Sequence, residues 1–263
     1  PQPPRLDARR GTRECSDAGV ARRMSARRLA IGTRRSPLAL YQARLVVELI
    51  AAAHPELDIE IREYEASGDT MLDVPAPLLA ADAFTDSIET ALAAGEIDAA
   101  VHSYKDLPIE PTCGLTIAAV PVRADPREAL VCARPLTLRE LPAGSVVGTS
   151  SERRGDAVRS LRPDLAIKPI RGAVDVRVSK VLAGEYDAAL LALAGLERLG
   201  LTEYVTEIFD VGTMPPAAGQ GALAVQCRSD DVFTRGILAD IDHAGIRAEV
   251  EAELRGMSRA AAE

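Results

Sequence analysis

Residues 29–38 read Leu-Ala-Ile-Gly-Thr-Arg-Arg-Ser-Pro-Leu and carry the chain from a strand into a helix. The apolar run Leu29 to Ile31 predicts a short buried strand. Ser36 followed by Pro37 has the chemistry of a helix N-cap with proline at the first helical position. Apolar residues then recur at the helical period, so we expect one amphipathic helix over residues 37–53. The stretch predicts one strand-turn-helix unit of an α/β sheet.

The alternation of strands and helices continues along the chain. Leu57, Ile59 and Ile61 alternate with charged residues, as in a half-buried strand. A helix near 85–94 and apolar strands at 99–101 and 116–122 follow. After the Pro-rich segment 121–127 the pattern repeats, and we expect strands at 146–147, 167–170, 188–193 and 222–225 and helices at 152–161, 175–183, 231–241 and 244–258.

This order predicts an α/β protein of two doubly wound lobes. Residues 121–127 and the Pro- and Gly-rich residues 212–221 would form a double crossover between the lobes. We expect lobe 1 to span 29–121 plus 222–240, lobe 2 to span 122–221, and 241–263 to be a C-terminal helical remnant. Ligands of such sheets bind in the crevice at the carboxyl ends of the strands.

The first 28 residues differ from the rest in charge. They carry eight arginines against three acidic residues, whereas the whole chain of 263 residues has a net charge of −8. Because this segment has few bulky apolar residues, we expect 1–28 to be a disordered Arg-rich leader. It lacks the apolar core of a signal peptide, and no later run approaches the roughly 20 apolar residues of a membrane span. We therefore expect a cytoplasmic protein without a membrane partner.

Composition also argues against several kinds of site. An acidic body without tryptophan and with 3% aromatic residues is atypical of nucleic-acid binders. The four cysteines show no C-x-x-C spacing and the three histidines form no spaced cluster, so we expect no metal site. We expect a monomer or weak dimer.

Residues 102–108, His-Ser-Tyr-Lys-Asp-Leu-Pro, place a Lys-Asp pair where a buried strand opens into a loop. Asp106 could be an ordinary loop carboxylate, satisfied by backbone N–H groups or by Lys105. Alternatively, it could stabilise a cationic intermediate and move a proton, with Lys105 beside it. We interpret His102 as a hydrogen-bonded histidine at a strand end.

Three strand-to-helix junctions, at 32–36, 148–154 and 171–177, carry arginine beside small or hydroxyl residues. Free N–H groups at a helix N-terminus and a guanidinium both favour carboxylate or phosphate. Each arginine alone could be a solvated charge, but three such junctions facing one cleft would bind a polyanion. Thr149 with Glu152 also fits a capping box.

Seven segments, in this order and spacing over about 29–240, resemble the hydroxymethylbilane synthase family, also called porphobilinogen deaminase. They are Ile31-Gly-Thr-Arg-Arg-Ser-Pro-Leu-Ala, Val101-His-Ser-Tyr-Lys-Asp-Leu-Pro, Asp125-Pro-Arg-Glu-Ala-Leu, Val147-Gly-Thr-Ser-Ser-Glu-Arg-Arg, Ile170-Arg-Gly, Gly184-Glu-Tyr-Asp-Ala and Pro216-Ala-Ala-Gly-Gln-Gly-Ala-Leu-Ala.

The resemblance implies lobes like those of type 2 periplasmic binding proteins, with a small third domain that we expect to be truncated here. It implies a transferase of porphyrin biosynthesis that condenses porphobilinogen units with loss of ammonia. Asp106 would stabilise the azafulvene cation, with Lys105 as the second catalytic residue. The substrate-binding residues expected are Arg34, Ser36, Phe84, Ser150, Arg153, Arg154, Arg171, Arg177, Arg198 and Gln220.

Family members carry a dipyrromethane cofactor on a cysteine of a Gly-Gly-Cys loop in the third domain. None of the four cysteines here matches that position, so we expect no cofactor. The leading hypothesis is a family-like enzyme of specialised metabolism that deaminates a small carboxylated amine, pyrrole-type or analogous, rather than an ordinary tetrapyrrole synthase. A non-catalytic two-lobe receptor for small anions and a true but truncated porphobilinogen deaminase are the alternatives.

Overall fold

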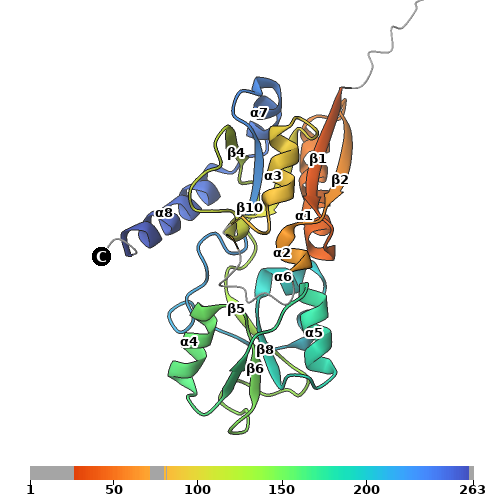
Figure 1. The fold of residues 1–263 in the computed structure, drawn as a ribbon. Helices are drawn as coiled ribbons and strands as arrows, with labels where there is room; N and C mark the ends of the chain where they lie inside the picture. Colours follow the sequence, from red (N-terminus) through yellow and green to blue (C-terminus); the bar gives the residue numbers. More distant parts are fainter. Residues whose placement is uncertain (1–26, 72–79, 81, 261–263) are drawn as a thin grey trace, which may run out of the picture.

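Two five-stranded sheets, one in each lobe, form the body of the protein. A computed structural model describes residues 27–71, 80 and 82–260, with side chains up to residue 256. Figure 1 shows lobe 1 above lobe 2, with extended segments passing between them. The expected leader lies outside the described residues except for its last two, and Arg28 already begins the first strand.

The sheet of lobe 1 has the strand order β2-β1-β3-β10-β4. β1 pairs in parallel with β2 and β3, whereas β10 runs antiparallel to β3 and β4. Helices α1 and α7 pack on one face and α3 packs on the other. The elements are β1 (Arg28–Arg34), α1 (Pro37–Ala53), β2 (Asp58–Tyr64), α2 (Ser67–Thr70), α3 (Asp86–Ala93), β3 (Ala99–Ser103), η2 (Tyr104–Asp106), β4 (Leu115–Ala119), β10 (Leu223–Arg228) and α7 (Val232–Ala239).

The sheet of lobe 2 has the corresponding order β7-β6-β8-β5-β9. Its strand β6 is parallel to β7 and β8, and β5 is antiparallel to β8 and β9. Helix α4 packs on one face, and α5 and α6 pack on the other. The elements are β5 (Glu128–Cys132), β6 (Val146–Gly148), α4 (Glu152–Leu161), β7 (Ala166–Lys168), α5 (Val174–Leu182), β8 (Ala188–Ala192), α6 (Leu193–Arg198), η3 (Thr202–Tyr204) and β9 (Val205–Ile208).

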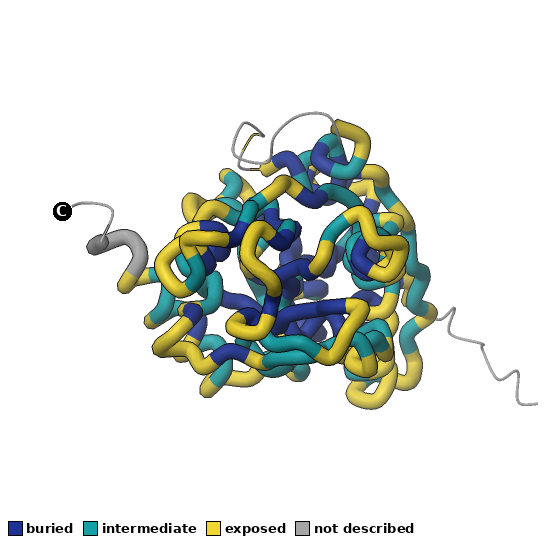
Figure 2. Tube along the Cα trace, turned by 90° about the horizontal axis from the view of Figure 1, so that it is seen from below, coloured by how far each residue is buried: buried dark blue, intermediate teal, exposed yellow. Residues whose placement is uncertain are grey.

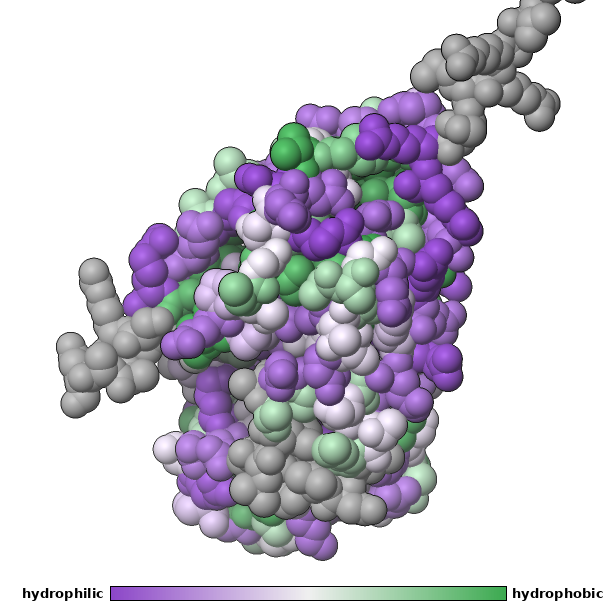
Figure 3. Space-filling model, turned by 45° about the horizontal axis from the view of Figure 1, so that its top comes forward, coloured by the Kyte–Doolittle hydropathy of each residue, from purple (hydrophilic) through white to green (hydrophobic). Residues whose placement is uncertain are grey.

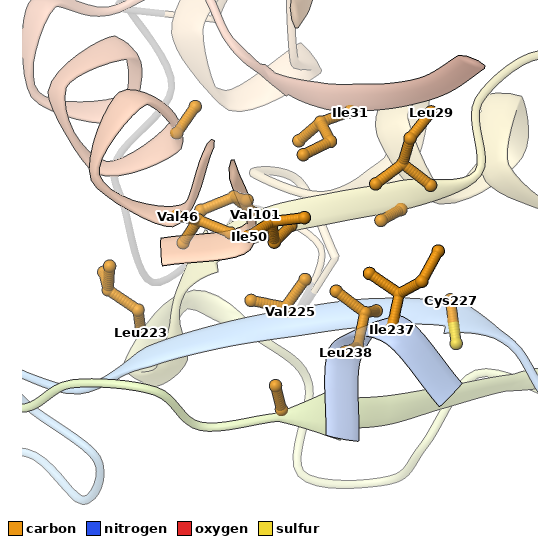
Figure 4. Packing of buried hydrophobic residues seen from close by; sticks show 13 residues of the cluster. Leu29, Ile31, Val46, Ile50, Val101, Leu223, Val225, Cys227, Ile237 and Leu238 are labelled. Atoms are coloured by element: carbon orange, nitrogen blue, oxygen red, sulfur yellow. The ribbon is translucent and has the colours of Figure 1, made fainter. Parts of the chain in front are cut away.

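Each lobe has its own apolar core. In lobe 1, Val46 and Ile50 of α1 pack on Ile31, Val101 and Val225 of the sheet, as Figure 4 shows. Burying a side chain of this size stabilises a fold by about 1.5–3 kcal/mol. In Figure 2 the buried residues lie in the interior and the exposed ones in the outer loops. The cores fix the two sheets, and with them the strand ends that face the cleft.

The two crossovers touch each other. Ala124 donates its N–H to the carbonyl of Gly221 at 3.0 Å, and Arg123 and Ala222 form an antiparallel bridge. Gly221 has φ +86°, and a Cβ there would lie 2.3 Å from the carbonyl oxygen of Ala124. Only glycine fits this approach without strain. The glycines of the second crossover therefore allow two chain segments to pass in contact between the lobes.

Helix α8 (Ala244–Ala260) leaves the body beside lobe 1. Its Val250 is fully buried against Tyr104 and Val120. Glu253 accepts from Arg123 at 2.8 Å and from the N–H of Gly219 at 2.9 Å, so one carboxylate holds both crossovers. Figure 3 shows a largely hydrophilic surface around lobe 1, with apolar residues appearing in patches.

The predicted α/β class with two lobes and a double crossover is confirmed by the two sheets. The sequence patterns did not predict β5, β9 or α6, and the strand expected over 188–193 ends at Ala192 because α6 begins at Leu193. The expected Thr149–Glu152 capping box is wrong. Ser151 is the N-cap of α4, and its side chain accepts from the N–H of Arg154.

Candidate active site

A cavity of about 230 Å³ lies between the lobes at the carboxyl ends of several strands. Asp106 is the one carboxylate among the described residues that line it. Of the twelve residues predicted for the site, eight line this cavity: Lys105, Asp106, Arg34, Ser36, Phe84, Arg154, Arg177 and Arg198. Among the described residues, side chains from both lobes therefore meet around one acidic side chain.

The side chains that line the cavity lie at the ends of strands and helices. Ser36 caps α1 by accepting from the N–H of Ala39 at 3.2 Å, as the Ser-Pro pair predicts. β3 ends in the short helix η2, which carries Lys105 and Asp106. In lobe 2, Arg154 and Arg177 lie in the first turns of α4 and α5, and Arg198 ends α6. Lobe 2 therefore contributes cationic groups from three helix termini.

Asp106 has a side chain that is 29% exposed and lies 3.6 Å from Nη1 of Arg34. Arg34 also binds Asp69 through both carboxylate oxygens and stacks on Phe84, with 4.8 Å between the guanidinium and the ring centre. Burial opposes the charge of Arg34, but the hydrogen bond with Asp69 and the charges of Asp106 and Asp69 raise its pKa overall. Arg34 is therefore a permanent cation that is already paired.

Lys105 donates its Nζ hydrogen bond to Oε1 of Gln220 at 3.0 Å. Desolvation by the surrounding protein, and then the positive charge of Arg154, lower the pKa of Lys105 to about 8. Lys105 is nevertheless exposed to cleft water, which screens much of this effect. Lys105 is therefore the lining group closest to changing charge near neutral pH.

His102 lies behind the cleft and is 4% exposed. Burial first, and then the charge of Arg34, lower its pKa to about 4 against a hydrogen bond with Gln226 that raises it, so the imidazole is neutral at pH 7. Its Nε2 has no hydrogen-bond partner among the described residues. The expected satisfied histidine is thus buried and neutral, but one nitrogen lacks a partner.

Arg177 and Arg198 are the cleft arginines without a carboxylate partner among the described residues. Arg177 donates to the carbonyl of Gly172 at 2.7 Å, and Arg198 to that of Gly221 at 2.6 Å. Burial and then the charges of Arg154 and Arg171 lower the pKa of Arg177 to about 10, and burial lowers that of Arg198. A bound anion would relieve this crowding of positive charge.

Four predicted residues lie outside the cavity lining. Ser150 donates to the carbonyl of Ile170 at 2.7 Å, and Arg153 is bound to Glu128 and to the carbonyl of Pro215. Arg171 donates to the carbonyl of Gly68 at 3.1 Å, which links the lobes. Gln220 is fully buried and donates to the carbonyl of Pro126 at 2.6 Å. In the structure these side chains contact protein groups around the cleft.

Sequence reasoning missed three polar residues at the site. Glu128 is fully buried and pairs with Arg153 and Arg154. Asp69 forms an ion pair with Arg34. Gln42 donates a hydrogen bond to the hydroxyl of Ser103 at 3.0 Å, at the cavity wall. A polar residue on the apolar face of helix 37–53 could have identified Gln42. The pairings of Glu128 and Asp69 depend on contacts between distant segments, which no local pattern reports.

Other kinds of site find little support in the described part of the chain. Its histidines, cysteines and acidic residues form no group able to hold a metal ion. Across residues 27–71, 80 and 82–260, no helix has the length and apolar character needed to cross a bilayer.

The sequence matches known proteins over most of its length. The family model described as "Porphobilinogen deaminase, dipyromethane cofactor binding domain" matches residues 29–235. The porphobilinogen deaminase of Roseiflexus castenholzii is 44% identical over 232 residues, which cover 88% of this chain and 77% of that protein. That of Brevibacillus brevis is 44% identical over 224 residues, covering 85% of this chain and 72% of the relative.

Solved structures with the same fold are far more distant in sequence. A Bacillus subtilis lipoprotein described as methionine-binding superposes with a TM-score of 0.51 at 13% identity, covering 88% of this chain and 96% of that one. The effector-binding domain of BenM, solved with benzoate, gives a TM-score of 0.50 at 16% identity over 86% of this chain and 93% of that one. At these identities the likeness concerns the fold alone.

The match to a cofactor-binding domain overturns the expectation that no cofactor is bound. That expectation followed from the missing attachment cysteine, but the domain that matches is the one named for binding dipyrromethane, and it spans both lobes. The matched region and the 44% identity to curated relatives decide the classification: the chain belongs to the porphobilinogen deaminase family.

Proposed function

We propose that the cleft binds a small carboxylated amine of the porphobilinogen type and that the protein releases its amino group as ammonia. The observation that carries this proposal is the carboxylate of Asp106, the single one among the described lining residues, in a cavity lined by Arg34, Arg154, Arg177 and Arg198. Carboxylates of the substrate would bind the guanidinium groups, which suit planar anions. This binding would leave the amine-bearing carbon near Asp106.

The proposed step is cleavage of the bond between that carbon and the nitrogen. The electron pair leaves with nitrogen, which departs as ammonia after taking up a proton, and the carbon skeleton becomes a cation. A carboxylate held nearby stabilises such a cation electrostatically. Lys105, with a pKa lowered to about 8 by the surrounding protein and by Arg154, can supply or take up a proton beside Asp106.

The cleft also suits the dipyrromethane group that the family match implies. Arg177 and Arg198 have no carboxylate partner in the described chain, and Nε of Arg154 is a buried donor without a partner. Cations without a carboxylate partner fit a ligand with several carboxylates, and Arg154, Arg177, Arg198 and Ser36 would hold it. When bound, the dipyrromethane supplies the primer to which substrate units are added.

The earlier expectation of a divergent substrate relied on the absence of this cofactor, and it loses that support. Porphobilinogen itself is therefore the first substrate to test. Incubation of the purified chain with porphobilinogen should release ammonia, and intact mass should report any covalently held dipyrromethane. A protein that binds porphobilinogen in calorimetry without releasing ammonia would instead be the two-lobe anion receptor.

A further inference from the structure

Glu128, which the proposed reaction does not use, lies at the centre of a network of charged and polar side chains. It is the first residue of β5, directly after the first crossover, and is fully buried. Its Oε1 lies 2.5 Å from Nη2 of Arg153, and its Oε2 lies 2.8 Å from Nη2 of Arg154. One carboxylate therefore shares its charge between two guanidinium groups in the first turn of α4.

The network extends from Glu128 to the cleft. Arg154 and Lys105 both approach Oε1 of Gln220, at 3.5 Å and 3.0 Å. Gln220 also donates to the carbonyl of Pro126, and Arg153 donates to that of Pro215. Both crossovers and Lys105 of lobe 1 are thus linked to the buried Glu128 through Arg153, Arg154 and Gln220.

We infer that Glu128 is a positioning residue whose charge holds Arg153 and Arg154 in place and limits the positive field of the cleft. Arg153 and Arg154 pair with this one anion behind the cavity, and Lys105 joins the network through Gln220. Without its charge, the cleft would hold carboxylates more tightly and would release them more slowly. This inference concerns the same cleft as the proposed function and depends on that proposal only in assuming that the ligand is a carboxylate.

The charged groups around Lys105 make its titration a direct probe of the inference. Desolvation lowers its pKa most, Arg154 and Arg153 of α4 lower it further, and Asp106 of η2 and Glu128 of β5 raise it. On its other side, Lys105 borders a second cavity that Glu89, Arg247 and Glu251 also line. Removing the charge of Glu128 should lower the pKa of Lys105 below that of the unaltered protein.

The chain offers a direct measurement, because it contains only three lysines, Lys105, Lys168 and Lys180. Side-chain NMR of labelled lysine should show the Lys105 midpoint moving to lower pH in Glu128→Gln, while Lys168 and Lys180 stay unchanged. Calorimetry with a pyrrole dicarboxylate should show about tenfold tighter binding, as expected for loss of one like-signed charge near the ligand. Neither readout requires turnover, so a protein that releases no ammonia still tests the inference.

Two further variants separate charge from structure. Glu128→Asp keeps the charge but shortens the side chain, so the Lys105 midpoint and the affinity should return toward those of the unaltered protein even if stability falls. Asp164→Asn removes one charge paired with Arg162 on an exposed part of lobe 2 and should change neither readout.

An unchanged Lys105 midpoint in Glu128→Gln, or equal behaviour of the Gln and Asp variants, would overturn the inference. Should Glu128→Gln fail to fold, Arg153→Gln tests the same network, because it removes a positive instead of a negative charge. It should raise the Lys105 midpoint, because Arg153 lowers the pKa of Lys105. A midpoint that stays or falls in this variant would equally contradict the proposal.

Discussion

The two lobes share one strand order but differ in the charges that they present to the cleft. Lobe 1 contributes Asp106, Lys105 and an arginine, Arg34, that is already paired with two carboxylates. Lobe 2 contributes three lining arginines, of which only Arg154 has a carboxylate partner in the described chain. The comparison suggests a division of labour, in which lobe 2 holds the acidic ligand and lobe 1 carries out the chemistry.

Asp106→Asn tests the lobe 1 side of this division and should have the largest effect. Ammonia release from porphobilinogen should fall about a thousandfold, because the amide cannot offset a developing cation. Calorimetric affinity for a pyrrole dicarboxylate should remain or increase. Asp58→Asn, an exposed aspartate at the start of β2, is the matched control and should leave turnover unchanged. Equal loss in both variants, or none in Asp106→Asn, would remove Asp106 from the chemistry.

Arg177→Gln tests lobe 2. Loss of one charge-assisted hydrogen bond should raise KM about 10- to 100-fold, with a smaller change in kcat. Arg134→Gln, an exposed arginine of the same lobe, should be neutral. The division of labour fails if Arg177→Gln lowers kcat and leaves KM unchanged.

Gly221→Ala tests the contact that joins the lobes. The backbone at φ +86° and the 2.3 Å approach to Ala124 should cost about 2 kcal/mol of unfolding free energy, measured by thermal or denaturant unfolding. Gly236→Ala, in the exposed part of α7 with no atom within 4 Å of the added Cβ, should instead stabilise by up to about 1 kcal/mol. Equal Tm values for the two variants would contradict the tight crossover.

Alkaline pH should weaken ligand binding because Lys105 of lobe 1 loses its positive charge. The surrounding protein and Arg154 lower the pKa of Lys105 to about 8, so its positive charge is present below that pH and is lost above it. Affinity for a pyrrole dicarboxylate should therefore fall a few-fold between pH 7 and pH 9, and this loss should vanish in Lys105→Gln. A pH dependence that persists in the variant would assign the titration to another group.

The helix caps of the two lobes should give the smallest effect. Ser36→Ala and Ser151→Ala each remove a side chain that accepts from a first-turn N–H group, of α1 and α4 respectively. Each should cost about 1 kcal/mol of stability. The bond of Ser151 is longer, 3.5 Å against 3.2 Å for Ser36, so its variant should lose less. The reverse order would show that the cap of α4 contributes more than its geometry indicates.

Local patterns predicted the elements whose sequence carries a period or a cap. Helix 37–53 agrees with α1 and helix 152–161 with α4, because Ser-Pro and the apolar spacing are local signals. β5 was missed because it follows Pro126 and begins with a buried charge, and α6 because it continues the apolar run of β8 without a turn residue.

For the site, sequence located the charged junctions but not their pairings. Arg34 meets Asp69 across 35 residues of chain, and Arg153 meets Glu128 across 25, so only the folded chain reveals which arginines remain free. The cofactor expectation failed for a related reason. It treated one attachment residue as the whole binding site, whereas the match to the cofactor-binding domain covers residues 29–235 and so includes parts of both lobes.

A crystal structure of the Asp106→Asn protein soaked with porphobilinogen would show which lobe binds which end of the substrate. The substrate carboxylates should lie against Arg177 and Arg198 of lobe 2, with the aminomethyl carbon facing residue 106 of lobe 1. Porphobilinogen bound elsewhere, or with its carboxylates directed at lobe 1 and its amine away from residue 106, would contradict this division of labour.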